Sequence, residues 1–261
     1  AGQCLRPQDI GLLASLGVGS PRVVRRPTIG IVSTGDEVVT VDSTPGPGRV
    51  RDVNTYMLAA LAAQAGASPF IVGLVRDDEA ALTAAVSRSY ERYDLTVLSG
   101  GSSMGQRDLT AAIFMSIPGA ELLVHGVSVS PGKPFIWARA GERNLLGLPG
   151  QVASCMIAFH LFVEPMIERM LGREPTSFRG FGRVTARLAA NVPAGPGRET
   201  FQRVRVGTDG NGAVAEPIFG KSGVLKTLTE GQGLVRIPLG SEGMAAGATV
   251  TVMLFPQEAL Q

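Results

Sequence analysis

The chain has 261 residues, of which 44% are hydrophobic, and its 24 basic and 22 acidic side chains give a net charge of +2. This length and composition allow one large domain or two ordinary ones with a substantial core. The near balance of charge argues against a nucleic-acid protein that binds through a basic face. No apolar run is long enough to cross a membrane and no signal-peptide pattern opens the chain, so we expect no membrane partner.

The two cysteines, Cys4 and Cys155, lie far apart in the sequence. They form neither a disulfide framework nor a cluster with metal-ligand spacing. We therefore expect a protein of the reducing cytoplasm, without a zinc or redox-metal site. His160 lies among apolar residues of a predicted helix, and we expect it to pack in the core.

The first 27 residues contain one predicted helix, residues 6–17, with Asp9 near its start and Gly17 as its stop. From residue 28 to residue 172 strand patterns alternate with helical patterns. Strands are expected at 28–33, 68–75, 94–98, 122–125, 135–139 and 143–148, and helices at 55–65, 78–92, 109–116 and 152–171. This alternation predicts an α/β domain over residues 28–172, in which a mostly parallel sheet is sandwiched by helices.

The character of the sequence changes after Gly172. Residues 173–177 form a predicted linker, and no helical period follows residue 178. Short alternating segments predict strands at 183–188, 201–206, 213–218, 233–237 and 249–254. Turns rich in glycine separate these segments, which favours a small all-β domain over residues 173–261, a barrel or a sandwich.

The most informative segment is residues 98–108, Leu-Ser-Gly-Gly-Ser-Ser-Met-Gly-Gln-Arg-Asp, which follows a buried-strand pattern. Its glycines allow a tight turn and a close backbone approach to a ligand. A strand that leads through such a turn into a helix can bind phosphate through backbone N–H groups, and Asp108 could hold a cation that bridges phosphates. The segment predicts a phosphorylated small molecule bound with Mg²⁺; the alternative is a purely structural turn.

Acidic residues follow three of the predicted strands: Glu37 the first, Asp77 and Asp78 the second, and Asp108 the third. In open α/β sheets ligands bind beyond the carboxyl ends of the strands. We therefore expect these four carboxylates to converge on one crevice and to hold a hard cation such as Mg²⁺. The alternative for each is a helix cap or a solvated carboxylate, and Asp78 stands where it would cap the next helix.

Two further segments suggest anion binding. Lys133 lies in a proline-flanked turn at residues 130–134, where its ammonium group could meet phosphate or an oxyanion. Residues 147–154 begin the last predicted helix of the α/β region, and the free N–H groups there, with Ser154, could bind an anion. The alternatives are an exposed lysine in a turn and an ordinary helix start.

Taken together, these segments resemble the molybdenum insertase family, the MoeA and gephyrin E-domain type of molybdopterin molybdenumtransferase. The matching segments occur in family order across nearly the whole chain: residues 9–17, 33–37, 52–54, 76–78, 99–105 with Asp108, 131–135, 148–150 and 219–223. The resemblance implies a MogA-like molybdopterin-binding fold followed by a small β-barrel, and a homodimer. It also implies insertion of molybdate into adenylylated molybdopterin, with Mg²⁺-dependent release of AMP.

The resemblance also implies roles for individual residues. Glu37, Asp77, Asp78 and Asp108 would be the acidic residues of catalysis, with Mg²⁺ on Glu37, Asp77 and Asp108. A larger set would bind the pterin nucleotide and molybdate: Ser99, Gly100, Gly101, Ser103, Gly105, Lys133, Pro149, Gly150, Ser154, Arg203 and Ser222. Within that set, Lys133, Arg203 and Ser222 would lie on the molybdate side.

The chain departs from the family pattern in three ways. Ser130 stands where the family usually has a lysine, Gln151 and Val152 replace an Asn-Pro pair, and only the final helix, residues 6–17, represents the two N-terminal domains. Two alternatives therefore stay open: a non-catalytic molybdopterin-binding or scaffold module, and a MogA-type molybdopterin adenylyltransferase. The trailing β-domain disfavours the adenylyltransferase, because that fold type usually stands alone.

Overall fold

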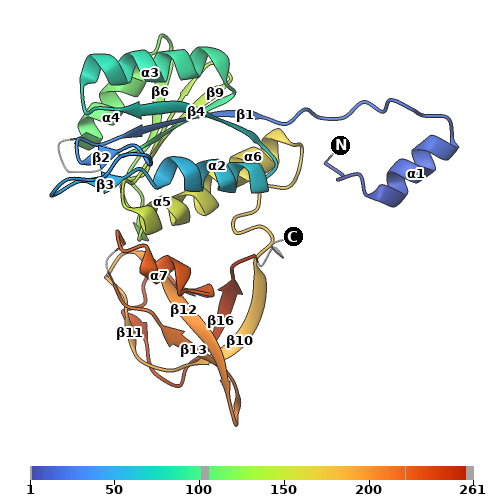
Figure 1. Cartoon of the computed structure of the whole chain (residues 1–261). Coiled ribbons are helices and arrows are strands. Elements are labelled where there is room, and N and C mark those ends of the chain that lie inside the picture. Colours follow the sequence, from blue (N-terminus) through green and yellow to red (C-terminus); the bar gives the residue numbers. More distant parts are fainter. Residues whose placement is uncertain (1, 101–105, 221, 257–261) are drawn as a thin grey trace.

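The structure is a computed structural model and describes residues 2–100, 106–220 and 222–256, with the backbone alone for residues 106–108. Figure 1 shows an α/β domain next to a β-barrel, and an N-terminal helix carried away from both on an extended segment. Within the described residues, no helix combines the length and the apolar character that crossing a membrane requires.

The α/β domain is built on a six-stranded sheet with the order β4-β1-β5-β9-β8-β6. Its strands are β1 (Thr28–Thr34), β4 (Ser68–Val75), β5 (Leu95–Ser99), β6 (Ala120–His125), β8 (Ile136–Ala140) and β9 (Arg143–Leu148). Four of them, β4, β1, β5 and β9, are parallel neighbours, and β8 runs antiparallel to β9 and β6. The predicted mostly parallel sheet is confirmed, and the carboxyl ends of four adjacent strands meet at one edge.

Helices cover both faces of this sheet (Figure 1). One face carries α3 (Glu79–Arg92) and α4 (Gln106–Met115); the other carries α2 (Asn54–Gln64), α5 (Val152–Ala158), the π-helical segment η1 (Phe159–Val163) and α6 (Glu164–Met170). The sequence predicted one uninterrupted helix over 152–171. Pro165 follows the π-helical segment, and the missing N–H and bulky ring of a proline account for a locally widened turn.

The N-terminal helix α1 (Pro7–Ser15) confirms the prediction for residues 6–17 but buries none of its residues. Its start is closed by Asp9, whose carboxylate accepts hydrogen bonds from the Arg6 backbone and side chain. Gly17 follows the helix with a φ of 77°, in the left-handed region where glycine is favoured. The segment that leads on to β1 is tied to the body where Arg25 meets Asp94 at 2.6 Å.

The C-terminal domain is a closed barrel. Its strands are β10 (Gly182–Leu188), β12 (Glu199–Asp209), β13 (Gly212–Pro217), β14 (Gly233–Ile237) and β16 (Thr249–Leu254). They follow the order β13-β10-β16-β14-β12, and pairing of β12 with β13 closes the ring. All five predicted strands are therefore confirmed, and the domain is a barrel and not a sandwich. Sequence patterns missed the four-residue helix α7 (Lys226–Thr229) and the short pair β11 (Val192–Pro193) and β15 (Gly243–Met244).

The two domains are joined by more than the linker. The two-residue strand β7 (Val129–Ser130) leaves the α/β domain and pairs in parallel with residues 199–200 of β12. Beside it a shared apolar cluster buries Ile157 of α5 against Phe201 and Leu234 of the barrel. The barrel is thus packed against the face of the α/β domain that carries α5, close to the carboxyl edge of the sheet.

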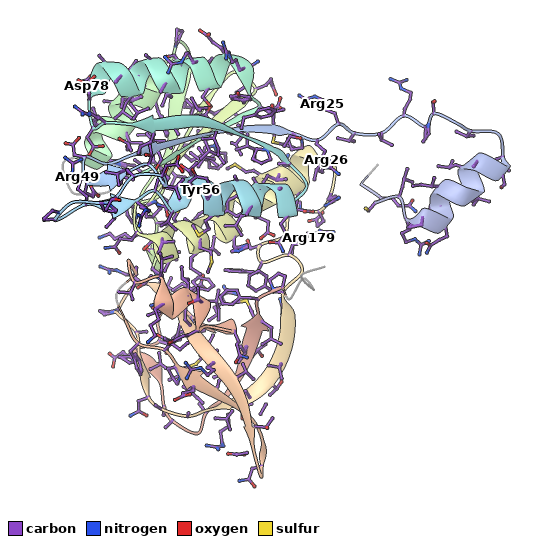
Figure 2. All side chains as sticks on the ribbon, viewed as in Figure 1. Arg25, Arg26, Arg49, Tyr56, Asp78 and Arg179 are labelled. Atoms are coloured by element: carbon purple, nitrogen blue, oxygen red, sulfur yellow. The ribbon has the colours of Figure 1, made fainter. Side chains whose placement is uncertain are left out.

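A buried carboxylate holds the linker. Glu168 of α6 is fully buried and forms ion pairs with Arg173 at 3.2 Å and with Arg179 at 2.8 Å; Figure 2 labels Arg179. We expect Glu168→Gln to lower the free energy of unfolding by about 1–2 kcal/mol in urea denaturation, because both arginines retain access to water. The exposed Glu216→Gln should change it by less than about 0.5 kcal/mol, and equal effects would contradict this account.

The Arg25–Asp94 contact predicts a pH dependence. Asp94 accepts two bonds from the Arg25 guanidinium and two from Thr28, and these donors hold the pKa of its carboxyl well below the usual range. Stabilisation by a depressed pKa is present above the unfolded-state pKa and is lost as the pH falls. We expect Asp94→Asn to lower the melting temperature by a few degrees at pH 7 and by progressively less below about pH 4. A difference that stays constant from pH 7 to pH 2 would refute it.

Candidate functional site

The first part of the site is the edge where β1, β4 and β5 end. Thr34, the last residue of β1, donates its hydroxyl hydrogen to Asp77 Oδ1 at 2.5 Å. The Asp77 backbone N–H in turn lies 3.4 Å from Asp36 Oδ1. Because Thr34 and Val75 are paired in register, the residues that follow each strand are brought together. Asp77 therefore stands at this edge beside Asp36, a residue to which the sequence analysis gave no role.

The other predicted acidic residues are placed differently. Asp78 caps α3, and its carboxylate accepts a hydrogen bond from Ala81 N at 2.8 Å. This is the helix cap that the sequence analysis gave as its alternative role. Figure 2 shows Asp78 at the start of that helix. Glu37 is exposed in the turn after β1. Asp108 lies in the first turn of α4, and its side chain is outside the described part of the structure. Among the side chains that are described, no three carboxylate, histidine or cysteine groups gather as metal ligands. The convergence of Glu37, Asp77, Asp78 and Asp108 on one crevice therefore stays a prediction.

Gly100 shows why a glycine must follow β5. Its φ is 117°, and a Cβ atom there would lie 2.1 Å from the Thr34 carbonyl oxygen. Its N–H donates to the Leu148 carbonyl at 3.2 Å, so this residue contributes backbone shape and not a free donor. Gly101, Ser103 and Gly105 lie outside the described residues.

A buried amide lies beneath this edge. Asn54 donates through Nδ2 to Ser99 Oγ and to the Gly150 carbonyl, both at 2.8 Å. The residue is 8% exposed, and its Oδ1 is buried without a hydrogen-bond partner among the residues that the structure describes. An unsatisfied buried acceptor costs about 1–3 kcal/mol. Sequence reasoning gave Asn54 no role, although residues 52–54 were among the segments that carried the family resemblance.

Cys155 lies behind Ser99 and is not a nucleophile. Its Sγ is 3.8 Å from Ser99 Oγ, and burial raises the pKa of the thiol to about 12. A thiol with so high a pKa stays protonated and unreactive at neutral pH.

The second part of the site is a buried cation on the barrel. Arg203 of β12 is 8% exposed and donates to Thr227 Oγ1 at 2.6 Å and to the Gly220 carbonyl at 3.0 Å. Burial lowers the pKa of Arg203, and no carboxylate within the described ranges forms an ion pair with it. A desolvated guanidinium whose partners are neutral is suited to an anionic ligand.

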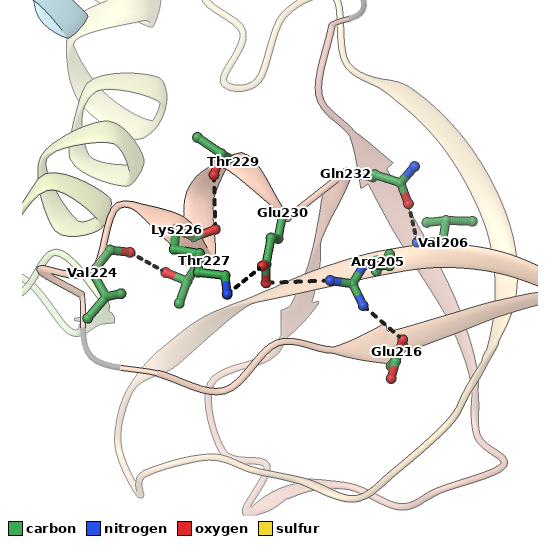
Figure 3. Close-up of polar contacts among 9 residues, drawn as sticks. All are labelled: Arg205, Val206, Glu216, Val224, Lys226, Thr227, Thr229, Glu230 and Gln232. Atoms are coloured by element: carbon green, nitrogen blue, oxygen red, sulfur yellow. Dashed lines mark hydrogen bonds and ion pairs between the residues drawn. The ribbon is translucent and has the colours of Figure 1, made fainter.

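Contacts around α7 hold Thr227, one of the two partners of Arg203, and Figure 3 shows these contacts. Thr227 donates its hydroxyl hydrogen to the Val224 carbonyl at 2.7 Å, which leaves the oxygen to accept from Arg203. Glu230, at the end of this helix, pairs with Lys226 and with Arg205 of β12, each at 3.4 Å. The helix is therefore held against the strand that carries Arg203.

The remaining predicted anion-binding residues meet where the two domains join. The Ser222 carbonyl accepts from Ala153 N at 3.0 Å, which places Ser222 at the start of α5. Ser154 is buried in that helix start, and a Cβ atom on Gly132 would lie 3.8 Å from the Ser154 carbonyl oxygen. Lys133, next in that turn, is exposed. The structure thus brings together the turn that contains Gly132, the start of α5 and Ser222 of the barrel.

An open hollow of about 590 Å³ adjoins the edge, beside the pair β2 (Val38–Val39) and β3 (Val50–Arg51). Its lining includes Asp36, Arg49, Leu74 and Arg76. Apolar strand residues beside two guanidinium groups suit a ligand that combines a flat ring with negative charge.

Residues 30–169 match the family model described as "Probable molybdopterin binding domain", and residues 185–255 match "MoeA C-terminal region (domain IV)". The chain belongs to the MoeA-type molybdopterin molybdenumtransferase family. It is 32% identical over 259 residues to the molybdopterin molybdenumtransferase of Bacillus subtilis (strain 168), with 98% of this chain and 59% of that protein covered. The corresponding protein of Staphylococcus aureus (strain Mu50 / ATCC 700699) is 29% identical over 262 residues, with 100% and 61% covered.

A solved relative has the same architecture. The crystal structure of the molybdopterin biosynthesis MoeA protein from Pyrococcus horikosii matches with a TM-score of 0.82 and 32% identity, covering 98% of this chain and 61% of that one. The MoeA-type arrangement of a mostly parallel sheet followed by a five-stranded barrel is therefore present here. The chain spans about three-fifths of the length of these relatives.

The close approach of Gly100 to the Thr34 carbonyl can be tested by substitution. Gly100→Ala should lower the free energy of unfolding by about 3 kcal/mol, because the new Cβ meets a backbone oxygen and the φ suits only glycine. Urea denaturation measures this loss. Gly46→Ala is the matched control, since a Cβ atom there has nothing within 4 Å. Similar stability of both variants would contradict the geometry described above.

Proposed function

We propose that this chain inserts molybdate into adenylylated molybdopterin and releases AMP. The observation that supports this most directly is Arg203, a buried cation with neutral partners. It lies on the barrel, whose Ser222 contacts the start of α5. An oxyanion bound at this junction would stand next to the edge where a phosphorylated ligand is expected, which is the juxtaposition that the reaction requires.

The residues of the junction divide the binding of molybdate among them. The guanidinium of Arg203 offers planar paired N–H donors to a tetrahedral dianion. Ser154 and Ser222 add hydroxyl donors, and Lys133 adds a mobile charge from the exposed turn. On the pterin side, Ser99 and Gly100 shape the end of β5, and Pro149 and Gly150 shape the turn before α5. Gly101, Ser103 and Gly105 would complete the phosphate contacts.

Mg²⁺ fits this edge as a cation shared with the substrate. Magnesium ordinarily takes only one or two protein carboxylates and completes its shell with phosphate oxygens and water. We assign Asp77, which lies at this edge, to the ion, with Glu37 and Asp108 as its companions. When bound, the ion neutralises the charge that grows on the phosphates as AMP leaves. Asp78 keeps its structural role as a cap and contributes charge alone.

We further propose a cytoplasmic homodimer, with residues 28–172 as the pterin-binding domain and residues 173–261 as the domain that closes the oxyanion side. Exposed apolar side chains on the N-terminal segment support an interface there: Ile10 is 56% exposed, Leu12 61% and Leu16 70%. Nine residues of helix are too few to be stable alone in water, so α1 needs a partner surface.

A second candidate function is a module that binds molybdopterin without turnover. Ser130 in place of the family's lysine favours it, because the junction then has one cation fewer. Incubation with adenylylated molybdopterin, Mg²⁺ and molybdate separates the two functions. Release of AMP together with protein-bound molybdenum supports the insertase, and tight pterin binding without AMP supports the module. Adenylylation of molybdopterin from ATP would instead identify an adenylyltransferase.

The assignment of Asp108 leads to a specific expectation. Asp108→Asn should reduce Mg²⁺-dependent AMP release by roughly tenfold or more, because a carboxylate that helps to hold the ion is lost. Raising the Mg²⁺ concentration should recover part of the rate. Glu121→Gln, an exposed position on the edge strand β6, serves as the control. Unchanged AMP release in the Asp108 variant would count against this role.

A further inference from the structure

The amide of Asn54 is used in an unusual way for its position. It is the first residue of α2, and short polar side chains at a helix start commonly hydrogen bond to nearby backbone. Asp52 fills that local role instead, accepting from Thr55 N at 3.1 Å and from Thr55 Oγ1 at 2.6 Å. The Asn54 amide reaches two segments that lie 45 and 96 residues further along the chain. The start of the helix does not need it.

The two segments that Asn54 joins belong to different parts of the site. Ser99 ends β5 and directly precedes Gly100. Gly150 stands in the turn before α5, the helix whose Ala153 N–H binds the Ser222 carbonyl of the barrel. Both bonds come from one planar nitrogen, whose two N–H directions are fixed relative to each other. The amide therefore holds the turn before α5 against the end of β5, just beyond Ser99 and Leu148, the last backbone pair of β5 and β9.

The amide of Asn54 carries a cost beside its two bonds. Within the described residues its Oδ1 is buried without a hydrogen-bond partner, so one half of the amide stays unsatisfied while the other half holds the two segments. We propose that Asn54 is a positioning residue of the pterin-nucleotide site, holding the end of β5 and the turn before α5 at the separation that the ligand spans. This inference rests on the proposed function in that the ligand is the nucleotide substrate or its AMP product.

The test measures binding of AMP in the presence of Mg²⁺ by titration calorimetry, which does not depend on turnover. Asn54→Leu removes both donors and keeps the approximate shape. We expect its affinity for AMP to fall at least tenfold, with a melting temperature no lower than that of Thr55→Val. Thr55→Val is the matched control: it breaks a buried bond at the same helix start without touching Ser99 or Gly150, and should bind AMP like the unaltered chain.

A second variant guards against misfolding of the first. Ser99→Ala removes one of the two acceptors with little change in volume, and should weaken AMP binding at least threefold. Asn54→Leu combined with Ser99→Ala should lose no more affinity than Asn54→Leu alone, because Ser99 acts through the same contact. AMP affinity that is unchanged in Asn54→Leu, or equally reduced in Thr55→Val, overturns the inference.

The outcomes also separate this inference from the proposed function. If the unaltered chain binds AMP but releases none from adenylylated molybdopterin with molybdate, the insertase proposal fails while a loss of affinity in Asn54→Leu still supports the positioning role. If AMP is released normally by both Asn54→Leu and the unaltered chain, only the positioning role fails. If the unaltered chain does not bind AMP at all, both are overturned.

Discussion

The site depends on the close approach of two backbone segments at the carboxyl edge of the sheet. After β5 the chain turns so tightly against the end of β1 that a single added carbon on Gly100 would collide with the Thr34 carbonyl. That approach leaves the Thr34 hydroxyl beside Asp77 and the Ser99 hydroxyl beside Asn54. Parallel strands put their ends at one edge in any such fold, and the glycine allows the ends of β5 and β1 to approach this closely.

Charge is divided between the two domains. The sheet domain supplies the carboxylate of Asp77 at the edge, and the barrel supplies the buried guanidinium of Arg203. Docking of the barrel is therefore part of the site and not only of the fold. The pairing of β7 with β12, the apolar cluster around Phe201 and the bond from Ala153 N to the Ser222 carbonyl together fix where that cation stands. Two hydrogen bonds, to Thr227 and to Gly220, then fix how it points.

Local sequence patterns were enough for the regular elements and for the edge. Alternating apolar residues identified the five barrel strands, and the segment ending at Ser99 was placed correctly as a buried strand before a turn. Contacts between distant segments were beyond such patterns. Asn54 is the first residue of α2, where a polar side chain is ordinary, so nothing local shows that its amide bridges Ser99 and Gly150. The two residues of β7 are too few to show a period, and its partner strand lies about 70 residues away.

Ser130 gives the junction of the two domains less positive charge than the lysine of the family pattern would. Ser130 belongs to β7 and faces Thr200 of the strand that also carries Arg203, so a lysine there would stand beside the same junction. Among the residues of this junction that the structure describes, the cations are then buried Arg203 and exposed Lys133. A guanidinium fork and hydroxyl donors bind by shape and direction, whereas an ammonium group binds as a mobile point charge. Under the proposed function, recognition of an oxyanion would therefore rely more on the fixed direction of Arg203, and hence on the docking of the barrel, than on total positive charge.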